Sequence, residues 1–268
     1  MPEEFQFRFS FQKLPPPGAE ALTDSVAEQF LLKKLDARGG TCLDSVWSLA
    51  SWYQRVGDFD KASGYIQRFM ELTDDPEKLG AGHLALGSLE EGRGDYAAAA
   101  QRYRAALSME PCSTVTWYFI HNNLGYSLNQ IKEYSSAIPY LRTAVEIDPG
   151  RPNAYKNLGL AYEALGDLGQ AAELFITATQ VNSADSRSLK HLISLVEANP
   201  ALEVDIPNLR ERIEACEKAV EVARQHKPDF DKYWDRLRAD QLRADQLRAE
   251  QKRKWWQFWR RRKDATKD

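Results

Sequence analysis

A repeat of 34 residues constrains this chain more than any other feature of its sequence. Two units stand back to back at 118–151 and 152–185, and in register they share several identities. The shared positions are Asn123/Asn157, Leu124/Leu158, Gly125/Gly159, Ala137/Ala171, Ala144/Ala178 and an acidic turn residue, Glu133/Asp167. Self-similarity at a fixed period indicates an array of similar folding units, and it sets the architecture before any helix is assigned.

Two weaker units lie upstream, at 80–113 and 43–76. Three residues separate these two, and four separate 80–113 from 118–151, so the period is not strict there. Their matching motifs are Leu86-Gly87 with Gly94-Asp95-Tyr96, and Leu49-Ala50 with Gly57-Asp58-Phe59. The four units span 43–185, which is about half of the 268 residues.

Each unit is predicted to form two helices that are joined by a turn at its Gly-Asp position. In the last unit Leu158, Ala161, Tyr162 and Leu165 fall at i, i+3, i+4 and i+7, which is one face of a helix. Small residues such as Gly159 let paired helices approach closely. One helical pair cannot bury its apolar face alone, so neighbouring pairs must stack. The sequence therefore predicts an all-α solenoid.

This pattern resembles the tetratricopeptide repeat (TPR), most closely in the stretch NLGLAYEALGDLGQAAELF at 157–175. The resemblance implies a right-handed superhelix whose inner surface is lined by the first helix of each pair. The sequence departs from the family pattern at four positions. Glu90 replaces a Tyr, Lys132 replaces the turn Gly, and Asp74 and Ser183 replace the closing Pro.

The segments before the array have their own patterns. Residues 1–18 form an extended segment in which Phe5, Phe7, Phe9 and Phe11 alternate with polar residues, which is a strand pattern. Its pairing stays open: a second copy, a partner's sheet edge, the chain's own groove, or none. Residues 19–40 are predicted to hold a capping helix from about Thr23 to Arg38. Its apolar side is expected to comprise Val26, Phe30, Leu31 and Leu35.

The segments after the array are also predicted to be helical. Residues 186–227 are interpreted as a divergent fifth helix pair, with the second helix starting at Asp205-Ile206-Pro207. Residues 228–250 repeat an LRADQ motif whose leucines are five apart, so they circle a helix without forming a stripe. We predict a charged helical arm there.

The segment 251–268 is a basic, aromatic tail. Seven cations in 251–263 leave a charge of −10 for the remainder, because the whole chain carries −3. Indole rings favour membrane interfaces and clustered cations favour anionic lipid, so the tail is predicted to bind an anionic membrane surface. Nucleic-acid binding is the weaker alternative, and contact with the acidic body is a third. The residues are Lys252, Arg253, Lys254, Trp255, Trp256, Phe258, Trp259, Arg260, Arg261, Arg262 and Lys263.

No catalytic motif is found: the chain lacks a phosphate-binding Gly-rich loop, HExxH, CxxC and a Ser-centred elbow. We therefore expect no enzyme activity, cofactor or metal site. Three widely spaced cysteines, Cys42, Cys112 and Cys216, favour reduced, buried thiols and a cytoplasmic location. No apolar run has the ~18 residues of a membrane span, and an acidic N-terminus without an apolar core argues against a secretory signal.

The inner surface implied by the resemblance holds the candidate binding residues. They are Asn122, Asn123, Tyr126, Asn129, Lys156, Asn157, Arg187, Lys190 and His191. Asparagine amides can bond a peptide backbone, and cations can hold a carboxylate. The set partly resembles carboxylate-clamp TPRs, which hold acidic C-terminal tails: Asn157 matches the clamp's central Asn, whereas Asn122, Tyr126 and His191 depart from it.

The sequence thus predicts a non-enzymatic TPR scaffold or adaptor that binds a peptide or protein partner in its groove. An acidic or C-terminal tail is one candidate ligand. The tail would place the protein at the inner face of a membrane. Two alternatives stay open, a nucleic-acid-associated factor that uses the tail and a self-associating scaffold.

Overall fold

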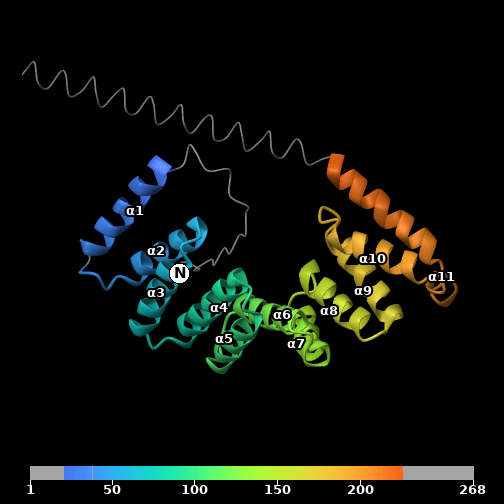
Figure 1. The fold of residues 1–268 in the computed structure, drawn as a ribbon, viewed down its shortest axis with the longest axis horizontal. Coiled ribbons are helices and arrows are strands. Elements are labelled where there is room, and N and C mark those ends of the chain that lie inside the picture. Colours follow the sequence, from blue (N-terminus) through green and yellow to red (C-terminus); the bar gives the residue numbers. More distant parts are fainter. Residues whose placement is uncertain (1–20, 38, 226–268) are drawn as a thin grey trace, which may run out of the picture. The chain divides into compact units, whose positions relative to one another are not determined.

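The computed structural model describes residues 21–37 and 39–225, and every regular element in these ranges is a helix (Figure 1). The all-α prediction is confirmed for this part of the chain. The strand pattern in 1–18, the arm at 228–250 and the tail at 251–268 lie outside it. The helices are α1 (Ala21–Asp36), α2 (Leu43–Val56), α3 (Phe59–Glu71), α4 (Pro76–Arg93), α5 (Tyr96–Ser108), α6 (Thr114–Gln130), α7 (Tyr134–Ile147), α8 (Pro152–Ala164), α9 (Leu168–Val181), α10 (Arg187–Ala198), α11 (Leu202–Asp205) and a further helical segment at 209–225.

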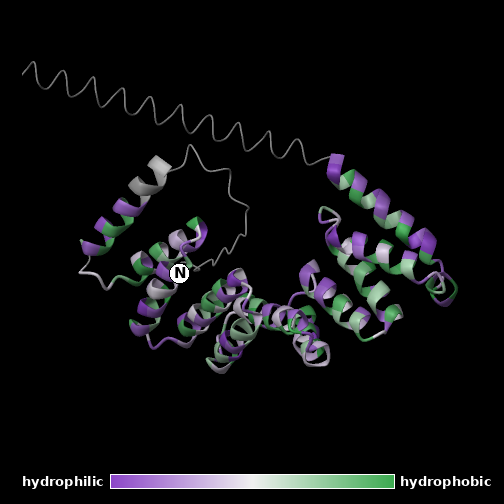
Figure 2. Ribbon diagram, in the orientation of Figure 1, coloured by the Kyte–Doolittle hydropathy of each residue, from purple (hydrophilic) through white to green (hydrophobic). Residues whose placement is uncertain are grey.

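The chain divides into two compact units, Met1–Leu174 and Phe175–Asp268, and each is described by itself. In the first unit consecutive helices pair as the hairpins α2/α3, α4/α5 and α6/α7, and each hairpin contacts the next helix. The helices α4, α6 and α8 also contact one another in sequence, so they form one layer. Hydrophobic and hydrophilic residues are interspersed along these helices (Figure 2), and α4 is buried over most of its surface from Gly80 to Leu89. Stacked hairpins are therefore the building plan of this unit.

Glycine and an acidic residue form the turn within the hairpins, as the sequence predicts. Gly57, Gly94 and Gly166 adopt φ values of +83°, +80° and +84°, a left-handed conformation that ends a helix at little cost for glycine. Asp95 then caps α5, since its carboxylate accepts a hydrogen bond from the Ala98 amide at 2.9 Å. In the third unit Lys132 takes the glycine's place and still adopts a left-handed φ of 65°. The turn geometry therefore survives this substitution, although at a steric cost.

Two first helices begin four residues before the repeat units predicted at 80 and 118. α4 starts at Pro76 behind the N-cap Asp75, and α6 starts at Thr114 behind the N-cap Ser113. Glu77 joins these extensions, because its carboxylate accepts hydrogen bonds from the Ser113 amide at 2.9 Å and the Thr116 hydroxyl at 2.5 Å. The residues that appear as spacers in the sequence are thus helical and fix one hairpin to the next.

Paired helices approach closely where the first helix carries glycine. A Cβ atom placed on Gly87 would lie 2.4 Å from the Tyr103 ring, and one placed on Gly125 would lie 2.4 Å from Leu141 Cγ. Both partner side chains are fully buried. The second helix therefore occupies the space that any larger side chain would need, which is why this repeat position is glycine in both units.

α1 covers the start of the array, but with a different face from the one predicted. Leu35 is buried, and Leu31 and Leu32 pack against the core cluster of α2 and α3. Phe30, which we predicted on the packed side, is 66% exposed, so that assignment is wrong. Tyr53 ties α1 to α2, since its hydroxyl donates to the Glu28 carboxylate at 2.5 Å. The helix is held by its leucines and by this bond.

In the second unit α10 buries Leu189, Leu192, Leu195 and Val196. The helix start predicted at Asp205 is wrong, because Asp205 ends the short α11 and the next helical segment begins at Leu209. The short helix has too few residues for a periodic pattern to reveal it. The later segment follows the expected stripe, with Leu209 and Cys216 buried. All three cysteines are free thiols, but Cys112 is exposed, so not all of them are buried.

Among the described residues, no helix combines the length and the apolar character that crossing a bilayer requires.

The close contact at Gly125 generates a stability prediction. Gly125→Ala should lower the free energy of unfolding by about 1–3 kcal/mol, because the added methyl group must displace Leu141. Gly64→Ala in α3 is the matched control: nothing lies within 4 Å of its Cβ position, so alanine should stabilise by up to about 1 kcal/mol. Urea unfolding followed by circular dichroism measures both. A Gly125→Ala protein as stable as the wild type would show that the helices can separate freely.

Candidate functional site

A strip of polar side chains crosses the layer formed by α4, α6 and α8. We call it the polar strip, and it links each of these helices to the next. Its members are Glu91 on α4, Asn122, Asn123, Ser127 and Asn129 on α6, and Asn157 on α8.

The junction of α4 and α6 is centred on the Glu91 carboxyl group. The Ser127 hydroxyl donates a hydrogen bond to Glu91 Oε1 at 2.9 Å. The phenol of Tyr103, from α5, also hydrogen-bonds this carboxyl group and lies 3.5 Å from the Ser88 hydroxyl. Two other helices, α5 and α6, thus supply neutral hydroxyl groups to one acidic side chain.

The junction of α6 and α8 consists of amides. Asn157 Nδ2 donates to Asn122 Oδ1 at 3.1 Å, and Asn129 Nδ2 donates to the Asn157 carbonyl oxygen at 2.8 Å. Asn122 Nδ2 in turn donates to Asn123 Oδ1 at 2.9 Å. The Oδ1 atoms of Asn129 and Asn157 are buried without a hydrogen-bond partner. These amides hold the two helices in register.

The predicted groove residues of the first unit therefore divide into two classes. Asn122, Asn129 and Asn157 are buried, and each takes part in a hydrogen bond between α6 and α8. Asn123, Tyr126 and Lys156 are half-buried, so part of each side chain reaches the surface. The second class is the one that an arriving ligand can contact without a rearrangement of the helices.

The other three predicted residues lie in the second unit. Arg187 is ion-paired with Asp185, with Nη2 and Oδ2 2.5 Å apart, and this hydrogen-bonded pairing raises the pKa of the guanidinium. Lys190 is exposed, and the His191 ring stacks on Phe175 with centroids 5.4 Å apart. Their membership of one groove with the polar strip stays a prediction.

Sequence reasoning missed Glu91 and Ser127. In the sequence Glu91 is one half of a Glu-Glu pair, a pattern typical of a solvated helix surface. A usable signal exists, because Glu91 follows Ser88 by three residues and so shares its helix face. Both glutamates are half-buried, and only the contacts with Ser127 and Tyr103 show that Glu91 is the one that faces the helix layer.

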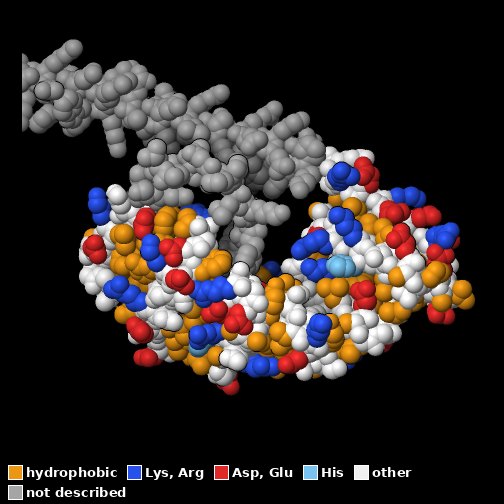
Figure 3. Space-filling view, viewed as in Figure 1, with side chains coloured by type: hydrophobic (Ala, Val, Ile, Leu, Met, Phe, Trp, Pro, Cys, Tyr) orange, Lys and Arg blue, Asp and Glu red, His pale blue; other side chains and the backbone are white. Residues whose placement is uncertain are grey.

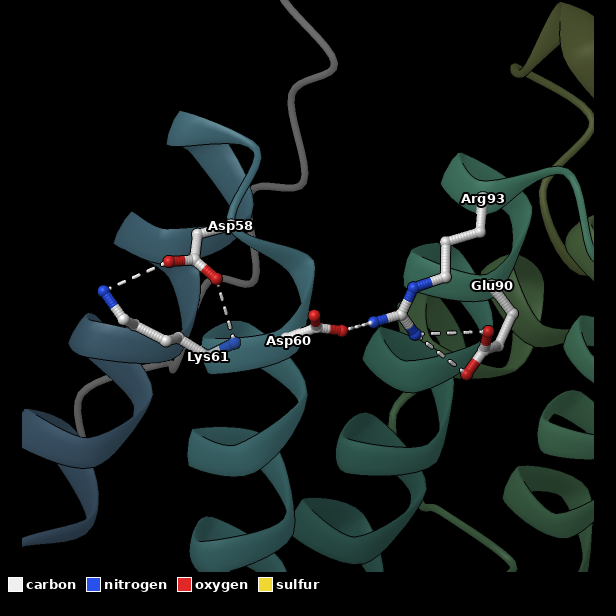
Figure 4. A network of polar contacts seen from close by, with 5 residues as sticks. All are labelled: Asp58, Asp60, Lys61, Glu90 and Arg93. Carbon is white, nitrogen blue, oxygen red and sulfur yellow. Dashed lines mark hydrogen bonds and ion pairs between the residues drawn. The ribbon is translucent and has the colours of Figure 1, made fainter.

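The two glutamates are in different electrostatic environments, and Figure 4 shows that of Glu90. Glu90 is ion-paired with Arg93 at 3.3 Å, and the same guanidinium binds Asp60 of α3 at 2.6 Å. Glu91 has no ion pair within the described ranges. Burial raises the pKa of Glu91 to about 7, although the hydrogen bonds from Ser127 and Tyr103 act in the opposite direction.

His83 and His121 hold the same position in their repeat units; His83 is half-buried and His121 is buried. His121 is buried between aromatic rings, stacking on Trp117 at 5.3 Å and tilted against Tyr140 at 5.9 Å. Burial lowers the pKa of His121, and also that of His83. These rings therefore serve as neutral packing groups rather than as positive charges for a ligand.

Charges of both signs occur on the face of the molecule that Figure 3 shows. Acidic and basic side chains are interspersed with hydrophobic ones on the face in view in Figure 3. Selectivity for a ligand must then depend on individual positions rather than on a broad field of one sign.

The raised pKa of Glu91 makes stability depend on pH. The unfolded chain loses this proton near pH 4.5, whereas the folded chain keeps it up to about pH 7. The free energy of unfolding of the wild type therefore falls as the pH rises from 4.5 to about 7, and it falls no further on this account at higher pH. Glu91→Gln removes the titrating carboxyl group and with it this pH dependence. Between about pH 5 and about pH 8, the free energy of unfolding of the wild type should therefore fall by about 1–3 kcal/mol more than that of Glu91→Gln.

Urea unfolding at the two pH values measures this difference, and any pH-independent effect of the amide cancels. Glu71→Gln, at an exposed position of α3, is the control and should follow the wild type. Parallel pH profiles for Glu91→Gln and the wild type would refute the assigned environment of Glu91.

Three models of the tetratricopeptide repeat match this chain, at residues 48–79, 84–152 and 131–194. Together they cover most of the span of the four predicted units. Among curated proteins, the chain is 26% identical over 161 residues to a CTR9 homolog of Arabidopsis thaliana, covering 59% of this chain and 14% of that protein. The chain thus spans about one seventh of the length of this relative.

Solved structures share the fold. MamA from Desulfovibrio magneticus RS-1 superposes with a TM-score of 0.53 and 22% identity, covering 68% of this chain and 96% of that one. YrrB, described as a TPR protein with an unusual peptide-binding site, superposes with a TM-score of 0.53 and 17% identity, covering 74% of this chain and 97% of that one. At these identities the likeness concerns the fold alone.

Proposed function

Because the chain belongs to the tetratricopeptide repeat family, we propose that it is a non-enzymatic scaffold that binds a peptide or protein partner along its first helices. Its all-α fold of stacked hairpins is that of a TPR solenoid. In this family the first helices line the inner surface, which here corresponds to the layer of α4, α6 and α8. The single observation that carries the proposal is the polar strip that crosses this layer.

The strip supports ligand binding because it places polar groups where an apolar surface would be more stable. Buried amides and a carboxyl group cost free energy unless every donor and acceptor is paired. Two amide oxygens in the strip lack partners. The half-buried Asn123, Tyr126 and Lys156 lie on the same helices. An extended peptide can bond such groups through its backbone while it contacts the Tyr126 ring.

The test uses the residues at the surface rather than the buried amides. Tyr126→Ala combined with Lys156→Ala should reduce recovery of bound partners in affinity purification with the full-length chain by about tenfold, since one aromatic and one charged contact are lost. Arg104→Ala, at an exposed position of the second helix α5, is the control. Asn157→Ala is unsuitable because it breaks the bond between α6 and α8.

Circular dichroism melts must show that the double variant keeps its fold. If the same partners return in equal amounts with the double variant and with the wild type, this face is not the binding surface. Arg187→Ala, in the second unit, tests separately whether that cation contributes.

We also propose that the tail at 251–268 holds the scaffold at an anionic membrane surface. The supporting observation is its sequence, in which Trp255, Trp256, Phe258 and Trp259 lie between two basic clusters. Aromatic rings insert at the interface while the cations attract anionic lipid. The scaffold would then present its partner beside the membrane.

Co-sedimentation with vesicles tests the tail. The full-length chain should bind vesicles that contain phosphatidylserine but not vesicles of phosphatidylcholine alone, and Trp255→Ala with Trp256→Ala should abolish most of the binding. Trp117→Phe, within α6, provides a tryptophan control outside the tail. Failure to bind anionic vesicles, together with salt-sensitive RNA binding, would replace this proposal with the nucleic-acid alternative.

A further inference from the structure

The carboxyl group of Glu91 has only neutral hydrogen-bond donors. Ser127 donates from α6 at 2.9 Å, and Tyr103 donates from α5. Hydroxyl groups can stabilise a carboxylate partly, but they bring no compensating charge. A partly buried acid in this setting costs free energy whenever it is ionised.

Arg93, the cation nearest to Glu91 in the sequence, is already ion-paired with other carboxylates. Arg93 binds Glu90 and Asp60, as the dashed contacts in Figure 4 show. In the part of the chain that the structure describes, no lysine, arginine or histidine pairs with Glu91. The titratable groups that face it are tyrosines, Tyr103 from α5 and Tyr126 from α6. Burial raises the pKa of both, that of Tyr126 to about 12, so they stay neutral at physiological pH.

Tyr126 precedes Ser127 on α6, the residue whose hydroxyl group hydrogen-bonds the Glu91 carboxyl group. Tyr126 is half-buried, and the Glu91 carboxylate is close enough to act on the charge of its phenol. The ring is held edge-on against Tyr96, with centroids 5.9 Å apart. Asn123, next to this pair, is also half-buried. A carboxylate and an aromatic ring on adjacent helices are the two kinds of group that recognise an alkylammonium or a guanidinium.

We infer that Glu91 and Tyr126 form a subsite for a lysine or arginine side chain of the bound peptide. The inference rests on the proposed function, and it specifies that the bound peptide carries a basic side chain at this position. Glu91 would supply the ion pair, Tyr126 the aromatic wall, and Ser127 would hold the carboxylate in place. In the first unit the subsite would therefore prefer a basic peptide, whereas the carboxylate-clamp resemblance implies an acidic one.

Binding at this subsite is linked to a proton. Because the Glu91 carboxyl group is largely protonated below pH 7, a peptide cation must displace its proton. Lysine and arginine remain charged throughout, so affinity should rise from about pH 6 to about pH 8. A peptide held only by apolar or backbone contacts would show no such rise.

A peptide library identifies the preference without knowledge of the natural partner. Phage carrying random 12-residue peptides are selected on the immobilised full-length chain, and enriched peptides are measured by fluorescence polarisation. We expect a recurrent lysine or arginine, whose replacement by glutamine weakens binding by about tenfold. Glu91→Gln should weaken the original peptide equally and abolish its pH dependence. Glu146→Gln, exposed on α7, should do neither.

The outcomes separate this inference from the function on which it rests. Peptides that need Tyr126 but show no basic preference, or that bind Glu91→Gln as well as the wild type, overturn the subsite and leave the scaffold function standing. If no enriched peptide is sensitive to Tyr126→Ala, or none is enriched, both ideas fail.

Discussion

The close approach of paired helices is the constraint on which the first unit depends. At Gly87 and Gly125 the second helix of the hairpin fills the space where a side chain would be, so the two backbones come as near as packing allows. This tightness lets successive hairpins repeat the same geometry. The first helices α4, α6 and α8 then contact one another, and polar side chains on neighbouring helices come within hydrogen-bonding distance.

The polar strip is a departure from what packing alone would select. Well-packed apolar residues between helices generally stabilise a fold at least as well as buried polar pairs do. Here a carboxyl group, one hydroxyl group and four amides occupy those positions, and two amide oxygens remain without partners. Such groups fix the register between helices because their bonds have direction. A ligand can reach the half-buried Asn123 and Tyr126, which lie on the same helix α6 as the buried Asn122 and Asn129.

Shared architecture explains the similarity to MamA and YrrB, since tight helical hairpins can carry many different surface residues. Function therefore has to be argued from the residues of the site. Here Glu90 and Glu91 differ in environment although they are adjacent. Arg93 is ion-paired with Glu90 and with Asp60 of α3, whereas Glu91 has no ion pair among the described residues and burial raises its pKa to about 7. This asymmetry is what gives the surface a chemical preference.

The sequence by itself determined the repeat, the all-α class, the Gly-Asp turns and the need for glycine at Gly125, because these follow from local periodicity and from backbone conformations that few residues adopt. It also selected the helices that carry the polar side chains. It misplaced Phe30 on α1 and the helix start at Asp205, since burial there depends on contacts that no local pattern encodes. Only the tertiary structure decided which asparagines are buried links and that Glu91 lies among neutral donors. The physical reason is that burial and charge compensation depend on neighbouring helices more than 30 residues away in the chain, as with Ser127 and Glu91.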